Sequence, residues 1–266
     1  MLSNGAEAMT PQFRRVSRRQ MLAWCRVILL LLLLLAWQFY ARWFGDPGLI
    51  SAPSEVLLAL VTRILSDSAV LTAVGVAVVE IATAFALSAT VGVALGVAIG
   101  WSTVGRRGAL PIVLLLYAVP QVILLPLFTM GFGVGPTCKI LFGVTHGAFP
   151  VVLNVVAGMR QVDRTLVHGA RAMGASDAAL IRHVYLPGMA PALFAGLRLA
   201  MTLCMLGVIL AELYVSTTGI GHFTMMFAQD FDPAPLFALV AVLAGVAIVM
   251  NETVRIAERR TMRWKN

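Results

Sequence analysis

Residues 169–187 read GARAMGASDAALIRHVYLP, and this stretch differs from the long apolar runs on both sides of it. Gly174 suits the end of one helix and Ser176 the cap of the next. We therefore predict a helical hairpin, with its first helix within residues 162–173, that leads into a further apolar run at Pro187. Taken alone, this hairpin fits a docking element for another protein and an ordered connecting loop equally well.

The composition around the hairpin is that of a membrane protein. The 266 residues are 60% hydrophobic and 12% charged, and the mean hydropathy is +0.90. A soluble core could not hide so much apolar surface, so we predict an all-α polytopic membrane protein in a lipid bilayer. The net charge of +8 follows from basic residues at the ends of the apolar runs, which argues against nucleic-acid binding.

Six apolar runs are long enough to cross a membrane. The third contains Pro120 and two further prolines, so we expect it to be bent or interrupted. Between the first two runs, Ser54 is the expected N-cap of a short amphipathic helix on the membrane surface. The predicted spans are Met21–Phe44, Ala69–Gly100, Leu110–Met130, Pro136–Met159, Ala190–Leu213 and Pro235–Ile256.

The charges at the span ends set the expected orientation. Arginines gather in the N-terminal tail, after the second span, between the fourth and fifth spans, and after the sixth. By the positive-inside rule these segments and both termini are cytoplasmic. The opposite side carries mostly acidic residues, with Lys139 and Glu212 counted among its charges. The expected organisation is a tail of residues 1–20, one transmembrane domain of residues 21–256 and a tail of residues 257–266.

The hairpin resembles the EAA loop of permease subunits of bacterial ABC importers. That pattern has Glu-Ala-Ala, three residues, Gly, nine residues, an aliphatic residue, one residue and Leu-Pro. Here it is filled by His168-Gly169-Ala170, Gly174, Val184 and Leu186-Pro187, so His168 replaces Glu and Gly169 replaces the first Ala. Further segments resemble the nitrate, sulfonate and taurine branch in the same order: GVALGVAIGWS at 92–102, PLFTMGFGVGPTCKI at 126–140, GLRLA at 196–200, AEL at 211–213 and GIG at 219–221.

This resemblance implies a type I ABC importer permease fold in the bacterial inner membrane, with the loop at about 160–187 coupling it to a separate ATPase. It implies a homodimer, two ATPase copies that hold ATP and Mg, and an extracytoplasmic substrate-binding protein. The chain itself has no phosphate-binding loop, because neither of its two lysines follows a glycine. We therefore expect no enzyme activity and no cofactor in this chain. The implied coupling residues are His168, Gly169, Ala170, Arg171, Gly174, Ala175, Ser176, Leu186 and Pro187.

Candidate pathway or gate residues are Glu80, Tyr117, Pro120 and Glu212. Glu80 stands in the second apolar run, where an ionisable group either faces a cavity or is paired near the outer interface. Family members often have Arg at the place of Glu80, and Arg near Tyr117. We see only Glu80 as a candidate for a buried charge network, and no catalytic constellation or metal-ligand spacing.

The predicted function is the permease subunit of an ATP-driven importer for a small solute of the nitrate, sulfonate and taurine class. Two alternatives stay open at this point. One is a permease for a neutral or cationic vitamin precursor, which also occurs in the branch. The other is a secondary transporter driven by an ion gradient, which would usually show buried charge networks or internal repeats.

Overall fold

The computed structural model describes residues 18–262, and these residues form helices and turns without a strand. The all-α prediction is confirmed. Most of the predicted tail 1–20, and residues 263–266 of the other tail, lie outside the described residues. The helices are α1 (Arg18–Trp43), α2 (Pro53–Ala59), η1 (Leu60–Ile64), α3 (Ser68–Trp101), α4 (Thr103–Ala118), η2 (Gln121–Leu124), α5 (Leu125–Phe132), α6 (Pro136–Gln161), α7 (Arg164–Ala172), α8 (Asp177–Leu180), η3 (Ile181–Tyr185), α9 (Leu186–Val215), α10 (Ile220–Gln229) and α11 (Pro233–Thr261).

Five of these helical segments are long and apolar enough to cross a membrane, and a sixth span results if α4 and α5 count as one. The axis bends by 83° between α4 and the Gln121–Phe132 segment. Pro120 stands at this break, where its ring removes a backbone donor and favours extended backbone in the residue before it. The predicted interruption of the third span is therefore confirmed.

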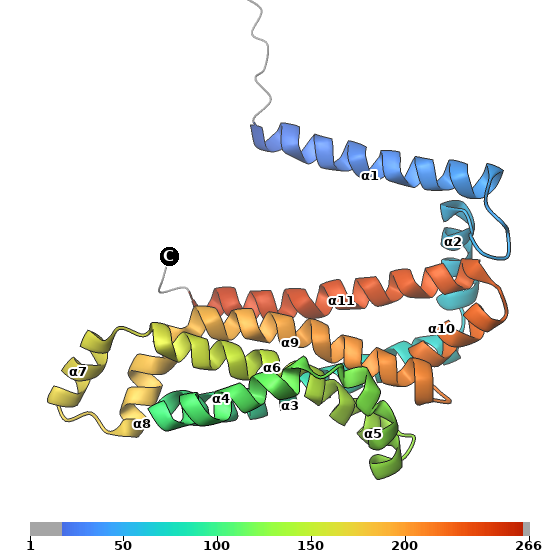
Figure 1. The fold of residues 1–266 in the computed structure, drawn as a ribbon. Coiled ribbons are helices and arrows are strands. Elements are labelled where there is room, and N and C mark those ends of the chain that lie inside the picture. The colour runs from blue at the N-terminus through green and yellow to red at the C-terminus, as the bar shows by residue number, and fades with distance from the viewer. Residues whose placement is uncertain (1–17, 263–266) are drawn as a thin grey trace, which may run out of the picture.

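The core forms where α6 packs against α3 on one side and α9 on the other (Figure 1). Glycines at every fourth position of α3 let its backbone approach α6 closely. A Cβ atom added to Gly92 would lie 2.6 Å from the Cβ of Val151, and one added to Gly96 would lie 2.7 Å from the Cβ of Val155. The glycine stripe thus sets the distance between the two helices.

The contact between α6 and α9 also depends on small residues. A Cβ atom on Gly147 would lie 2.2 Å from the Sγ of Cys204, which in turn lies 3.3 Å from the Oγ of Ser88 on α3. Cys204 is therefore a buried packing residue at the point where the three core helices meet.

The two ends of the bundle differ in what they carry. In Figure 1 the α7–α8 hairpin and the C-terminal end of α11 lie at one end, and α1 begins toward that same end. The other end carries α2, α5 and α10. The start of α1 and the end of α11 thus lie toward the same end of the bundle as the hairpin. A cytoplasmic location of this end stays a prediction.

The predicted cap of the short surface helix is wrong by two residues. Ala52 is the N-cap of α2, and its N–H donates to the carboxylate of Glu55 at 3.1 Å. Ser54 lies inside the helix and instead exchanges hydrogen bonds with Gln38 of α1. The tertiary partner on α1 decides the role of this hydroxyl group, and the local sequence does not contain that information.

Candidate functional site

The hairpin has the two helices and the break that the sequence predicts. The carboxylate of Asp163 accepts a hydrogen bond from the N–H of Thr165 at 2.8 Å and caps α7. Hydrogen bonds from Thr165, first from its N–H and then from its side chain, lower the pKa of Asp163, so the cap is ionised at neutral pH. The break follows at Gly174, whose φ of +84° favours glycine. Ser176 caps α8 by accepting from the N–H of Ala179.

The second arm of the hairpin leads without interruption into the fifth span. The helical segment from Asp177 to Val215 is continuous, so it begins well before the predicted start at Ala190. Leu186 and Pro187 follow the π-helical turn η3 inside this continuous segment, where the missing N–H of Pro187 removes one helical hydrogen bond. The second arm of the hairpin is therefore connected rigidly to α9 by continuous helix. Helix α9 in turn packs extensively on α6.

The first arm, α7, has two faces of different chemistry. Leu166 is 62% exposed and Met173 is 84% exposed, and their spacing of seven places them on one face. Apolar side chains so exposed on one face of a polar hairpin suit contact with another protein. The other face lines a cavity against the membrane domain with Arg164, Val167, His168 and Arg171.

The predicted coupling residues therefore lie in different places. His168 and Arg171 face the cavity, whereas a Cβ atom added to Gly169 or Gly174 would meet no atom within 4 Å. The carbonyl of Ala170 accepts from the N–H of Ala175 at 3.0 Å, which closes the turn. These small residues leave open space on the outside of the hairpin, where a partner could approach.

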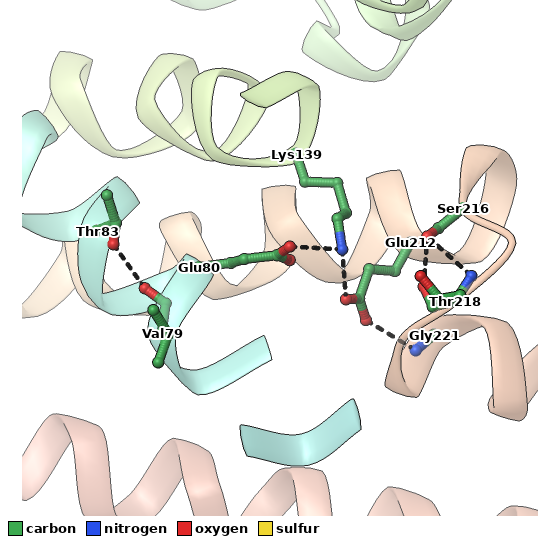
Figure 2. Close-up of polar contacts among 8 residues, drawn as sticks. All are labelled: Val79, Glu80, Thr83, Lys139, Glu212, Ser216, Thr218 and Gly221. Carbon is green, nitrogen blue, oxygen red and sulfur yellow. Dashed lines mark hydrogen bonds and ion pairs between the residues drawn. The ribbon is translucent and has the colours of Figure 1, made fainter. Parts of the chain in front are cut away.

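At the opposite end of the bundle, three charged side chains from three helices meet in the interior (Figure 2). The Nζ of Lys139 on α6 lies 2.7 Å from the Oε1 of Glu80 on α3. The same Nζ donates to the Oε1 of Glu212 on α9 at 3.1 Å. Glu80, Lys139 and Glu212 are 3%, 5% and 0% exposed. We call these three residues the buried triad.

The buried triad also holds the short helix α10 in place. The Oε2 of Glu212 accepts a hydrogen bond from the N–H of Gly221 at 2.9 Å, in the first turn of α10 (Figure 2). Gly219, just before α10, has a φ of +114°, and a Cβ there would lie 2.4 Å from the Oε1 of Glu212. The carboxylate thus sits at the helix N-terminus, where anions are favoured.

The four pathway candidates do not converge on one place. Glu80 and Glu212 belong to the buried triad, whereas Tyr117 lies on α4 with its ring 5.7 Å from that of Phe149. Pro120 begins the turn between α4 and η2. Glu80 is paired with Lys139, as one of the two alternatives in the sequence analysis expected. A place for Glu80 on the pathway of the assembled protein stays a prediction.

Lys139 is the site residue that the sequence analysis missed. It was counted among the charges of the outer side, together with Glu212, but both side chains are buried between helices at that end. The expectation that Glu80 alone could form a buried charge network is therefore wrong. The signal in the sequence is weak, because the three charged residues stand in three separate apolar runs, and only the packing of α3, α6 and α9 shows that they meet. No cluster of potential metal ligands occurs among residues 18–262.

Comparison with known proteins identifies relatives along almost the whole chain. Residues 88–263 match the family described as "Binding-protein-dependent transport system inner membrane component". The chain is 30% identical to the putative aliphatic sulfonates transport permease protein SsuC of Bacillus subtilis, over 95% of this chain and 92% of that one. It is 28% identical to the taurine transport system permease protein TauC of Escherichia coli, over 89% and 87%. The formylaminopyrimidine transport permease protein ThiX of Halalkalibacterium halodurans is 25% identical, over 88% and 93%.

A solved structure has the same fold. A chain of the MetNI methionine ABC transporter, in an inward-facing conformation, matches with a TM-score of 0.53 at 18% identity. The match covers 78% of this chain and 99% of that one. At this identity the match shows the fold alone.

Proposed function

Because the chain belongs to the family of binding-protein-dependent transport system inner membrane components, we propose that two copies of it form the substrate pathway of an ATP-driven importer. Each copy is one permease domain, residues 21–256, between two short tails. The energy comes from two copies of a cytoplasmic ATPase, which hold ATP and Mg. A substrate-binding protein delivers the solute from the other side of the membrane.

The α7–α8 hairpin is the element that couples the permease to the ATPase. The observation that carries this assignment is the pair of exposed apolar side chains, Leu166 and Met173, on the outward face of a polar hairpin. Burial of such side chains in a partner groove favours binding, because their apolar surface leaves water. Movement of the hairpin then reaches the core through the continuous helix from Asp177 to Val215.

The experiment that tests this assignment compares two methionines of equal exposure at opposite ends of the bundle. Met173 is 84% exposed on the hairpin, and Met130 is 85% exposed on α5. Met173→Gln should reduce co-purification of the ATPase by about tenfold or more, since burying a methionine side chain contributes about 1.5–3 kcal/mol. Met130→Gln should leave co-purification at the wild-type level. Equal ATPase recovery with both variants would sink the assignment.

For the solute, we propose a small solute of the nitrate, sulfonate and taurine class, and within it a sulfonate or taurine. The names of two relatives support this choice, at 30% and 28% identity. A vitamin precursor is the second candidate, and the formylaminopyrimidine permease, at 25% identity over a similar length, supports it. Uptake of taurine, an alkanesulfonate and a formylaminopyrimidine into proteoliposomes, each with its cognate binding protein, separates the two. Uptake of the pyrimidine alone would overturn the sulfonate assignment.

The rival mechanism is a secondary transporter, and one observation favours it. The buried triad is the kind of intramembrane charge network that ion-coupled transporters use. Family membership supports the ATP-driven mechanism instead, and Glu212 has a structural role at the start of α10. Solute uptake by the purified chain alone, under a proton or sodium gradient and without ATP, would reverse this choice.

A further inference from the structure

A second feature of the hairpin end is a cavity of about 940 Å³ between α7 and the membrane domain. Its walls come from the start of α4, the end of α6, the inner face of α7 and Tyr185. It is open on one side. Three apolar residues, Leu110, Met159 and Val162, form part of the same wall. The cavity thus combines an apolar part next to the membrane domain with the polar inner face of the hairpin.

The charges around this cavity are all of one sign. Five arginines and one histidine line it, and none of the described lining residues is acidic. The guanidinium of Arg106 donates to the carbonyl of Gly100 and to the hydroxyl of Thr103, which fixes it at the wall. Arg171 has an ion-pair partner in Asp177 at 3.5 Å. The remaining arginines have no ion pair within residues 18–262, and they are Arg107, Arg160 and Arg164.

Four of the five arginines have no carboxylate partner within residues 18–262, so their charges repel one another unless an anion lies between them. In open water the repulsion between these charges is weak. Here the arginines line one concave wall, where the low-dielectric surroundings strengthen the repulsion. Arginine binds phosphate groups through paired hydrogen bonds, and it does so better than lysine. The lining therefore suits a phosphate group or a similar polyvalent anion.

The place of the cavity along the bundle points to the source of that phosphate. Trp101 at the end of α3 and Tyr185 at the cavity wall pack edge to face, with ring centroids 5.6 Å apart. Aromatic side chains of this kind gather at the level of the lipid headgroups. Since α3 ends at Trp101 and α4 begins at Thr103, the cavity opens at that same level.

From these observations we propose that the cavity binds the phosphate headgroup of an anionic phospholipid of the cytoplasmic leaflet. The arginines hold the phosphate, and Leu110, Met159 and Val162 contact the start of the acyl chains. Basic pockets between membrane helices on the cytoplasmic side bind such headgroups by this chemistry. The bound lipid then fixes the inner face of α7 against the membrane domain.

The site is separate from the face proposed to contact the ATPase. Arg164, His168 and Arg171 recur at helical spacing on the inner face, whereas Leu166 and Met173 lie on the opposite side of α7. Lipid and ATPase can therefore occupy the hairpin at the same time. The lipid site does not depend on the proposed function, and its test uses arginines outside α7 or at its first position.

The experiment measures lipid bound to the purified full-length chain. Phosphatidylglycerol and phosphatidylcholine are offered together in a neutral detergent, and lipids retained per chain are counted by mass spectrometry of the intact complex. The cavity variant is Arg107→Gln, Arg160→Gln and Arg164→Gln combined. The control variant is Arg182→Gln, Arg259→Gln and Arg260→Gln, which removes the same charge from positions that do not line the cavity. Thermal unfolding without lipid verifies that both variants are folded.

Wild type and control should prefer phosphatidylglycerol to phosphatidylcholine, and the cavity variant should lose this preference. Each arginine near an anionic lipid surface favours binding by roughly fivefold, so three lost charges should weaken binding on the order of 100-fold. An equal loss in the control variant would overturn the proposal, because any basic surface would then suffice. Displacement of phosphatidylglycerol by excess inorganic phosphate, with the same arginine dependence, would overturn the lipid assignment and identify a soluble anion as the ligand.

Discussion

Lys139 compensates two buried carboxylates, and this makes it the most sensitive single residue of the bundle. Its Nζ contacts Glu80 at 2.7 Å and Glu212 at 3.1 Å. A buried charge without a partner is much more costly than a buried pair, because the low-polarity interior cannot replace the lost hydration. The intact triad therefore contributes little to the free energy of unfolding. Loss of Lys139 would leave two buried carboxylates without a counter-charge and would strongly destabilise the fold.

We expect Lys139→Met to lower the free energy of unfolding by about 3–5 kcal/mol, the usual cost of leaving a buried charge unpaired. Thermal unfolding of the detergent-solubilised chain measures this. Glu80→Gln is the control, because it leaves the contact between Lys139 and Glu212 in place and removes one excess negative charge. It should change stability by less than about 1 kcal/mol. A Lys139→Met variant as stable as wild type would show that the triad is hydrated.

Gly219 is the second residue at which a substitution should destabilise the protein. Its backbone conformation favours glycine, and there is no room for a side chain. Its φ is +114°, and a Cβ atom would lie 2.4 Å from the Oε1 of Glu212. Gly219→Ala should therefore destabilise the protein by about 1–3 kcal/mol. Gly245→Ala in α11 is the matched control, because nothing lies within 4 Å of its Cβ position. That change should stabilise by up to about 1 kcal/mol. Thermal unfolding of both variants decides, and equal shifts would contradict the close contact with Glu212.

At the scale of elements, the hairpin depends on one turn. Gly174 has a φ of +84°, and its N–H donates to the carbonyl of Arg171 at 2.9 Å. The turn sets the angle at which α7 projects from the continuous helix that begins at Asp177. A change in the turn should therefore move the docking face without disturbing the core formed by α3, α6 and α9.

Gly174→Pro should abolish ATP-dependent uptake while the thermal stability of the spans stays near the wild-type value. Proline fixes φ near −65° and has no N–H, so it can neither adopt this turn nor make its hydrogen bond. Gly174→Asn is the control, because asparagine tolerates positive φ and should retain most uptake. Both are measured in proteoliposomes with the ATPase present. Wild-type uptake by Gly174→Pro would mean that the angle of α7 is irrelevant to coupling.

At the scale of the whole molecule, the chain leaves one part of its bundle uncovered. The described residues bury no side chain of α4 and only Leu125 of α5, whereas α3, α6 and α9 share a packed core. Leu115 on α4 is 71% exposed. Helix α4 packs so little within its own chain that it fits the contact with a second copy proposed above.

A cysteine at Leu115 should therefore cross-link two copies through a bismaleimide. Ile248→Cys on α11 is the control, since Ile248 is 70% exposed but lies on a helix packed against α9. Replacing Cys25 by serine removes the exposed native thiol, and Cys138 and Cys204 are buried. Dimer bands for Leu115→Cys alone are the expected result. Equal cross-linking at both positions, or none at either, would contradict a dimer contact through α4.

Features that depend on local properties could be predicted from the sequence. Apolar run length identified the spans, and Pro120 indicated the break in the third one, because hydropathy and proline geometry act within a few residues. Gly174 and Ser176 located the hairpin for the same reason. The order of short motifs then indicated the family.

The tertiary structure alone decided which distant side chains meet. Lys139 stands at the start of α6, and nothing in its neighbourhood shows that it reaches Glu80 and Glu212 on two other helices. The role of Ser54 likewise depended on Gln38 of another helix. The physical reason is that a buried charge or hydroxyl is satisfied by whichever group the packing places within hydrogen-bond distance. Packing of α6 against α3 and α9 fixes those distances, and no local pattern encodes them.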